Sequence, residues 1–261
     1  MRTFGRTSLL VSGVALITAS AASARPLSSV AASQLPVVQA QLSAYGETAD
    51  TGGGIAAVTT VYDNWTAPPT VLRSLFVAGT DEIADDLTFP AGMPAGVGLL
   101  SNCGFNIANA NGPAGSALTG GQMAVRFYRL DDGNFIGGFN ANLPALNLAP
   151  GASSRLQFAD GALEGIGIII PTSGVYMSLQ VNTLTGTGGF TTANAGYQTR
   201  SPNAVGSSTD NLYNVTLGGA SFNFGGTPIA NTGLHIKTND VPEPAGLALL
   251  GLGALALRRR R

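Results

Sequence analysis

The chain has 261 residues, of which 44% are hydrophobic, 10% are charged and 36 are glycine. Soluble domains usually carry about a quarter charged residues and glycine is poor in helix interiors, so this composition excludes a helical bundle with a charged surface. The net charge of -1, with Lys237 as the only lysine, argues against a nucleic-acid-binding protein, and the single cysteine excludes an internal disulfide.

The first 24 residues have the three parts of a secretory signal peptide. Arg2 and Arg6 give a positive start, residues 9–17 are mostly apolar, and small residues follow. We expect a signal peptide helix over residues 1–24, export through the Sec translocon, and cleavage after Ala24, with Ala22 and Ala24 as the small residues of the cleavage site. The apolar run is too short for a permanent membrane anchor.

The middle of the chain divides into a short lead segment and one large domain. Residues 25–54 mix Ser, Ala, Gln and Pro and end in three glycines, so they are expected to be a linker or a first strand. Residues 55–240 are long enough for one sizeable core and show no composition break. They are expected to form a single exported domain. Without residues 1–24 and 241–261 the chain keeps 7 basic and 13 acidic residues, so the exported part is acidic.

Hydrophobic residues in this domain recur at every second position. Val175, Met177, Leu179 and Val181 alternate with polar residues, and similar alternation occurs at 99–107, 123–128, 155–158, 213–217 and 234–237. This period predicts strands with one buried face. We therefore expect an all-β fold, an antiparallel two-sheet β-sandwich of jelly-roll or immunoglobulin-like type. A glycine-rich β-solenoid is the alternative, but no repeat period is visible.

Three local features refine this expectation. The Asp-Asp-Gly-Asn sequence at 131–134 lies between two predicted strands and is typical of a hairpin turn. Residues 163–170 are almost continuously apolar and predict a central strand that ends at Pro171. Short helical turns are expected near residues 81–86 or in the proline-rich loops.

The last 21 residues form a second distinctive segment. Val241, Pro242, Glu243 and Pro244 precede an uncharged run at 245–257, and the chain ends in Arg258, Arg259, Arg260 and Arg261. As a helix the run would span about 20 Å, less than the roughly 30 Å hydrocarbon core, so it would be a short hydrophobic helix inserted transiently in the inner membrane. The four arginines resist translocation and act as a basic stop on the cytoplasmic side.

This tail resembles the PEP-CTERM sorting signal of bacteria in the order of its three parts: the Pro-Glu-Pro motif, the apolar run and the arginine-rich end. The resemblance implies recognition by an exosortase, which removes the tail and leaves the protein at the cell surface or outside the cell. It also implies a bacterium that exports extracellular polysaccharide. Segments 62–64, 81–86, 125–128 and 205–208 are similar to those of uncharacterised PEP-CTERM surface proteins, a similarity that brings no known activity.

The sequence offers little support for catalysis. Cys103 falls on the apolar positions of its strand and is expected to be a buried hydrophobic residue. His235 is the only histidine, which excludes a site with two histidine ligands, and we expect it on the polar surface of its strand. No Gly-x-Ser-x-Gly elbow is present. We therefore expect no enzymatic activity and no cofactor.

Two binding functions have weaker signals. Asp81, Asp85 and Asp86, or Asp131 and Asp132, could contribute oxygen ligands to Ca²⁺ in loops, although carboxylates in turns more often serve as caps. Trp65, the only tryptophan, would stack on a sugar if it were exposed, although a tryptophan in a sandwich is more often core. The function expected from the sequence is an exported cell-surface or extracellular-matrix protein; the alternative is a carbohydrate-binding module for extracellular polysaccharide.

Overall fold

A computed structural model describes residues 27–42, 58–65, 72–90, 97–201, 204–223 and 231–240. These residues form two β-sheets with three short 3₁₀ helices. The predicted signal peptide and the sorting tail, including the apolar run at 245–257, lie outside the described residues. Within the described ranges no helix combines the length and the hydrophobicity needed to cross a bilayer.

The first sheet has seven strands in the order β1-β8-β7-β11-β5-β13-β14. Their bounds are β1 Val37–Gln39, β5 Ile83–Thr88, β7 Ala117–Arg129, β8 Phe135–Leu143, β11 Val175–Thr187, β13 Ser207–Asn214 and β14 Ala220–Asn223. All neighbours pair antiparallel except β1, which runs parallel to β8. β7 and β11 are the longest strands of this sheet, and they place their side chains at its centre.

The second sheet contains the path β15-β12-β6-β16-β3, with β4, β9, β10 and β2 attached. The strands of this sheet are β2 Gln41–Leu42, β3 Val58–Asp63, β4 Leu72–Val77, β6 Val97–Asn109, β9 Ser153–Gln157, β10 Ile169–Pro171, β12 Ala195–Ser201, β15 Asn231–Thr232 and β16 Leu234–Asp240. β6 is its hub, because it pairs with β9, β10, β12 and β16.

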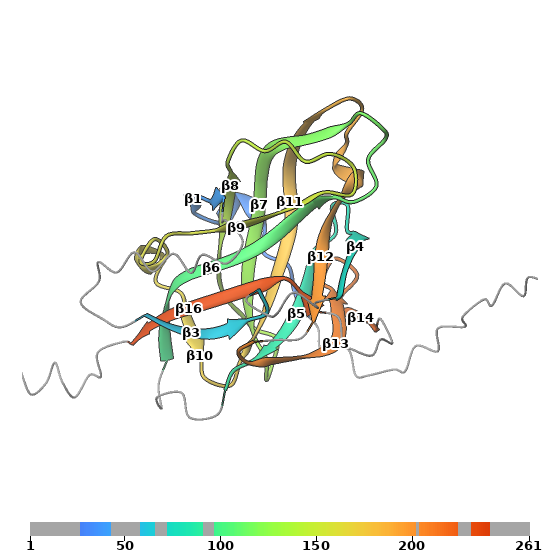
Figure 1. The fold of residues 1–261 in the computed structure, drawn as a ribbon. Coiled ribbons are helices and arrows are strands. Elements are labelled where there is room, and N and C mark those ends of the chain that lie inside the picture. Colours follow the sequence, from blue (N-terminus) through green and yellow to red (C-terminus); the bar gives the residue numbers. More distant parts are fainter. Residues whose placement is uncertain are drawn as a thin grey trace, which may run out of the picture.

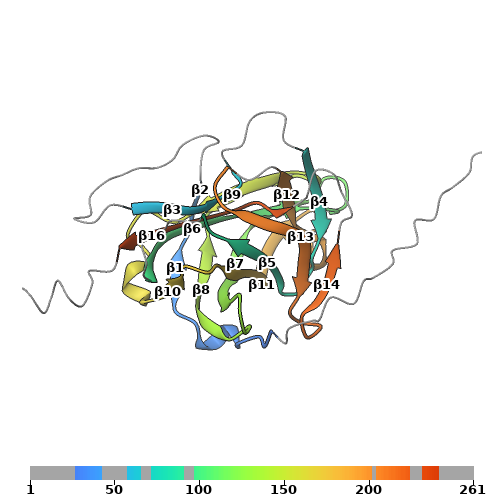
Figure 2. The same ribbon diagram turned by 90° about the horizontal axis from the view of Figure 1, so that it is seen from below.

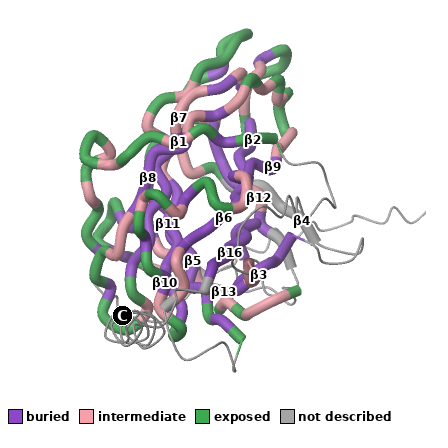
Figure 3. The backbone as a smooth tube through the Cα atoms, turned by 90° about the vertical axis from the view of Figure 1, so that its left-hand side faces the viewer, coloured by how far each residue is buried: buried purple, intermediate pink, exposed green. Residues whose placement is uncertain are grey.

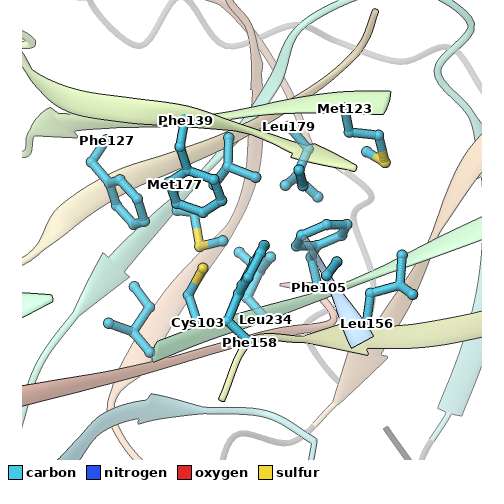
Figure 4. Close-up of a cluster of buried hydrophobic side chains, with 14 of the residues drawn as sticks. Cys103, Phe105, Met123, Phe127, Phe139, Leu156, Phe158, Met177, Leu179 and Leu234 are labelled. Carbon is cyan, nitrogen blue, oxygen red and sulfur yellow. The ribbon is translucent and has the colours of Figure 1, made fainter. Parts of the chain in front are cut away.

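The two sheets pack face to face around one apolar core. Figure 1 shows β6, β16 and β3 crossing in front of β7, β8 and β11. In Figure 4, side chains of the first sheet face those of the second. The labelled residues are Met123, Phe127, Phe139, Met177 and Leu179 on one side, and Cys103, Phe105, Leu156, Phe158 and Leu234 on the other. Phe158 contacts Phe139 edge-on, with 5.0 Å between the ring centroids.

The all-β expectation and the two antiparallel-rich sheets are thus confirmed, while the jelly-roll or immunoglobulin-like type stays a prediction. The alternating residues of β11 point into the core as expected, and Cys103 is fully buried. Figure 3 shows the same pattern along the chain, with buried strand centres and exposed connections. The hairpin prediction is also confirmed, because Gly133 lies in the turn between β7 and β8 with a φ of 76°.

Residues 27–42, left open above as a linker or first strand, hold β1 and β2. We call residues 27–39 the N-terminal strap: it contains a 3₁₀ turn, η1 (Ala32–Gln34), and ends in β1. Figure 2 shows it alongside β8. Directly after the strap, β2 pairs with β9 of the second sheet, so this short segment joins both sheets.

Two local predictions are wrong. Residues 81–86 are not helical: β5 begins at Ile83 and lies between β11 and β13. Residues 163–170 do not form a central strand, because they contain the 3₁₀ turn η2 (Glu164–Ile166), then Gly167 with a φ of 75°, and only then the short β10. The left-handed conformation at Gly167 ends the turn and prevents a continuous strand.

Candidate functional site

Trp65 follows β3 and is buried, with 3% of its surface exposed. Its ring lies against the backbone of Gly104, where an added Cβ would come within 2.2 Å of it. It stacks with His235 at 5.6 Å between ring centroids, and the Arg155 guanidinium carbon lies 3.7 Å from the tryptophan centroid. Trp65 therefore presents no open aromatic face for stacking on a sugar.

His235 is also buried, with 6% exposure, so the expected surface position is wrong. Burial is the main reason that its pKa falls to about 4, with Lys237 and Arg155 adding to the effect and Asp63 opposing it. Beside it, the Lys237 ammonium pairs with Asp160 at 3.2 Å, and Asp160 also accepts a hydrogen bond from Asn102. The outer side of β6 and β16 thus carries a buried polar layer.

Asp85 and Asp86, two of the calcium candidates, are buried on β5. Both accept a hydrogen bond from the Ser208 hydroxyl, at 2.6 and 3.1 Å, and Asp85 also accepts one from the Thr232 amide at 2.8 Å. Burial raises the pKa of both carboxyls, that of Asp85 well above its ordinary value. Asp81 accepts a hydrogen bond from Asn214 instead.

Asp131 and Asp132, the other calcium candidates, are exposed at the β7–β8 turn. Their carboxylates lie 3.0 and 3.7 Å from the Arg129 guanidinium, and Asp132 also accepts hydrogen bonds from Asn134. In the part of the chain that the structure describes, no three residues among His, Cys, Asp and Glu gather as a metal site. Calcium binding stays a prediction without support from this geometry.

A polar site that the sequence did not reveal lies on the outer face of the first sheet. The Arg126 Nη1 and Glu82 Oε2 atoms are 3.1 Å apart, and both side chains are almost completely buried. Tyr128 and Ser178 donate to Glu82 Oε1 at 2.7 and 2.6 Å. The strap covers the pair, since Ser29 donates to Glu82 and Arg126 Nε donates to the Val30 carbonyl at 2.8 Å.

Next to this ion pair lies an open groove of about 740 Å³, lined by the strap and by residues of β7, β8 and β11. The strap also contacts these strands directly, since Asn140 in β8 donates to the Ala32 and Leu35 carbonyls. Its lining consists of Ser29, Val30, Ala31, Ala32, Ser33, Leu35, Val37, Thr80, Gln122, Arg126, Asn140, Gln180, Val181 and Asn182. The Asn182 amide donates to Asn140 Oδ1 at 2.7 Å and to Gln122 Oε1 at 3.3 Å. In the folded protein these polar residues lie on the face of the first sheet that points away from the core. The sequence gives no sign that the strap lies next to them.

Residues 240–261 match the family model of the PEP-CTERM protein-sorting motif. Neither the curated proteins nor the solved structures contain a match to the chain. The motif implies exosortase-dependent sorting of a secreted protein, with a location at the cell surface or outside the cell. The matched segment begins at the last residue of β16, so it follows the folded domain directly.

Proposed function

Because this chain carries a PEP-CTERM sorting signal, we propose that it is an exported cell-surface or extracellular-matrix protein without enzymatic activity. It crosses the membrane through the Sec translocon and loses its signal peptide after Ala24. The apolar run at 245–257 then holds it transiently in the inner membrane, with the four arginines on the cytoplasmic side. An exosortase removes the tail and releases or attaches the domain.

The position of the motif supports this order of events. β16 pairs with β6 as far as Asp240, and Val241 is the next residue. Pro242 and Pro244 lack an N–H, and a proline disfavours helix in the residue before it, so this sequence favours an extended backbone for enzyme recognition. The four residues from Val241 to Pro244 reach at most about 14 Å, which places the folded domain close to the membrane and to the processing enzyme.

The proposal that the protein is not an enzyme is based on the positions of Cys103 and His235, the two side chains best suited to nucleophilic or acid–base catalysis. The Cys103 thiol is buried in the core, and burial raises its pKa, which disfavours the reactive thiolate. The only histidine is buried against Trp65. Neither group is placed to meet a substrate from solvent.

Cell fractionation tests the proposal. In a host with the exosortase, the mature protein should lack the tail and leave the membrane fraction. In a host without the enzyme, and in a variant with Pro242→Ala, Glu243→Ala and Pro244→Ala, it should keep the tail and stay with the inner membrane. Asp131→Ala, at an exposed acid far from the motif in sequence, is the control and should be processed normally. Identical products with and without the exosortase, or retention in the cytoplasm, would contradict the proposal.

A second candidate function, binding of extracellular polysaccharide, is favoured by one observation. The groove beside the strap is lined by the carboxamides of Gln122, Asn140, Gln180 and Asn182 rather than by exposed charges. The groove does not include Trp65. Trp65 is buried, so sugar binding by stacking on its ring has no support from the structure.

A further inference from the structure

We infer that the groove between the N-terminal strap and the first sheet is a binding site for neutral saccharides. This inference rests on the proposed export and gives the second candidate function a definite place. The groove volume of about 740 Å³ lies within the range of roughly 300–1,000 Å³ that is usual for small-molecule sites.

The hydrogen-bonding groups of the groove match those of sugar hydroxyls. A carboxamide offers two donors and an acceptor, and a hydroxyl both donates and accepts, so amides and sugars can satisfy one another in both directions. Asn182 donates to Asn140 and Gln122, Asn140 donates to the Ala32 and Leu35 carbonyls of the strap, and Gln122 donates to Asn142. These bonds hold three amides in fixed orientations before a ligand arrives, and they leave mainly the amide oxygens to accept hydrogen bonds from sugar hydroxyls. Gln180 donates only to the Thr80 carbonyl, at 3.3 Å, among the described residues.

The charge of the groove favours a neutral ligand. Arg126 is the only charged residue in the lining, and its guanidinium is paired with Glu82 and with the Val30 carbonyl. Its side chain is 1% exposed. A phosphate or carboxylate would have to compete with the buried Glu82 carboxylate for this cation, whereas a hydroxyl needs no net charge from the protein.

The strap also argues against an extended peptide as the ligand. Peptides often bind by adding a strand to a free sheet edge. Here the edge of β8 is already paired with β1, from Val37 to Gln39. Val30, Leu35 and Val37 of the strap supply apolar surface beside the amides, which suits the C–H faces of a sugar ring.

Nuclear magnetic resonance of the mature protein tests the site. The probes are neutral di- and trisaccharides of glucose, galactose, mannose and rhamnose, together with digalacturonate and inorganic phosphate. At least one neutral sugar should shift the side-chain amide signals of Gln180 and Asn182, and phosphate should not. Gln180→Ala should weaken that binding about fivefold, the effect of one hydrogen bond, while Gln34→Ala, at an exposed amide of the strap outside the groove, should leave it unchanged.

Three outcomes would overturn the inference: no response to any neutral sugar, equal binding by the wild type and Gln180→Ala, or a stronger response to phosphate or digalacturonate. The spectrum of each variant also reports whether it is folded, so a loss of structure is not mistaken for a loss of binding. Fractionation with and without the exosortase is independent of the groove. A failure of sugar binding with normal processing would refute the saccharide site alone.

Discussion

At the scale of single residues, the buried Glu82–Arg126 ion pair carries the largest energetic cost, because both charges are removed from water. Two opposite charges out of water are tolerated because Tyr128, Ser178 and Ser29 donate to the carboxylate. Removing one partner leaves the other charge buried and uncompensated. Arg126→Met should therefore lower the free energy of unfolding by about 3–5 kcal/mol, measured by urea denaturation.

Two further variants show whether the loss of stability in Arg126→Met comes from the unpaired buried charge. The double variant Glu82→Gln with Arg126→Met should recover most of the loss, because it leaves no buried charge at the site. Arg129→Met should change the free energy of unfolding by less than about 0.5 kcal/mol, because Arg129 is 47% exposed and its ion pairs are screened by water. An Arg126→Met protein as stable as the wild type would show that the pair is not buried as described.

His235 predicts a loss of stability in mild acid. Its pKa falls from about 6.5 in the unfolded chain to about 4 in the folded protein, so the folded state binds fewer protons between these values. His235 therefore makes its full contribution to the free energy of unfolding, about 3 kcal/mol, above pH 6.5. This contribution is lost as the pH falls toward 4. Because the chain has one histidine, its proton resonance gives an unambiguous titration with a midpoint near pH 4.

The acid loss can be separated from the opposite effect of Asp85. The raised pKa of Asp85 means that protonation favours the folded state, so this carboxyl adds stability as the pH falls through its folded pKa. Asp85 is present in both the wild type and His235→Asn, so its contribution largely cancels when the unfolding free energy of one protein is subtracted from that of the other. This difference should be constant above pH 6.5 and should change below it; a histidine titrating near 6.5 in the folded protein would contradict the buried position.

At the scale of elements, the strap should open without unfolding the sandwich. Leu27 packs in a small apolar cluster with Ala84, Tyr128, Tyr176 and Val215, outside the main core. Leu27→Ala should weaken this anchor and accelerate hydrogen exchange at the Ala40 amide, which donates to Asn142 in β8. Exchange at the Ile236 amide in β16 should not change. Leu217→Ala, at a side chain that is 67% exposed, is the matched control and should change neither exchange rate. If Leu27→Ala accelerates exchange equally at the Ala40 and Ile236 amides, the protein unfolds globally and the strap does not open by itself.

The hydrophobic residue at every second position predicted which face of most strands is buried. This prediction failed where a strand is irregular. In β6, a register shift against β16 between Leu100 and Asn102 places Leu100 in the core, where simple alternation placed Leu99. In β13, Leu212 is in the core, whereas Leu217 lies beyond the strand and is exposed. One extra residue reverses every later side chain, and local sequence carries no clear sign of it.

The candidate groove shows the same limit for a different reason. Of its amides, Gln180 and Asn182 alternate with the predicted core residues of 175–181, but polar faces are normally solvated and carry no sign of a site. The groove exists because the strap, about 100 residues away in sequence from β8, returns to cover that face. The tail was predictable because its signal lies in consecutive residues and needs no fold.

At the scale of the whole molecule, most of the charged residues whose burial the structure describes are buried or half-buried. Glu82, Asp85, Arg126, Arg155 and Lys237 are buried, while Arg129, Asp131 and Asp132 gather at one exposed turn. Much of the outer surface is therefore left to Ser, Thr, Asn, Gln and Gly. Such a surface forms hydrogen bonds with neutral hydroxyl groups, which is consistent with the proposed saccharide site.

The burial of the only lysine gives a test of the exported molecule as a whole. The Lys237 side chain is 7% exposed and is paired with Asp160, so an amine-reactive ester should not modify it in the folded mature protein. In urea, both Lys237 and the α-amine of the mature chain should react, and mass spectrometry counts the labels. The labelled terminal peptide also identifies the signal cleavage site, expected to leave Arg25 first. Rapid labelling of Lys237 without urea would contradict the packing of β16, and a different first residue would move the cleavage site without affecting the fold.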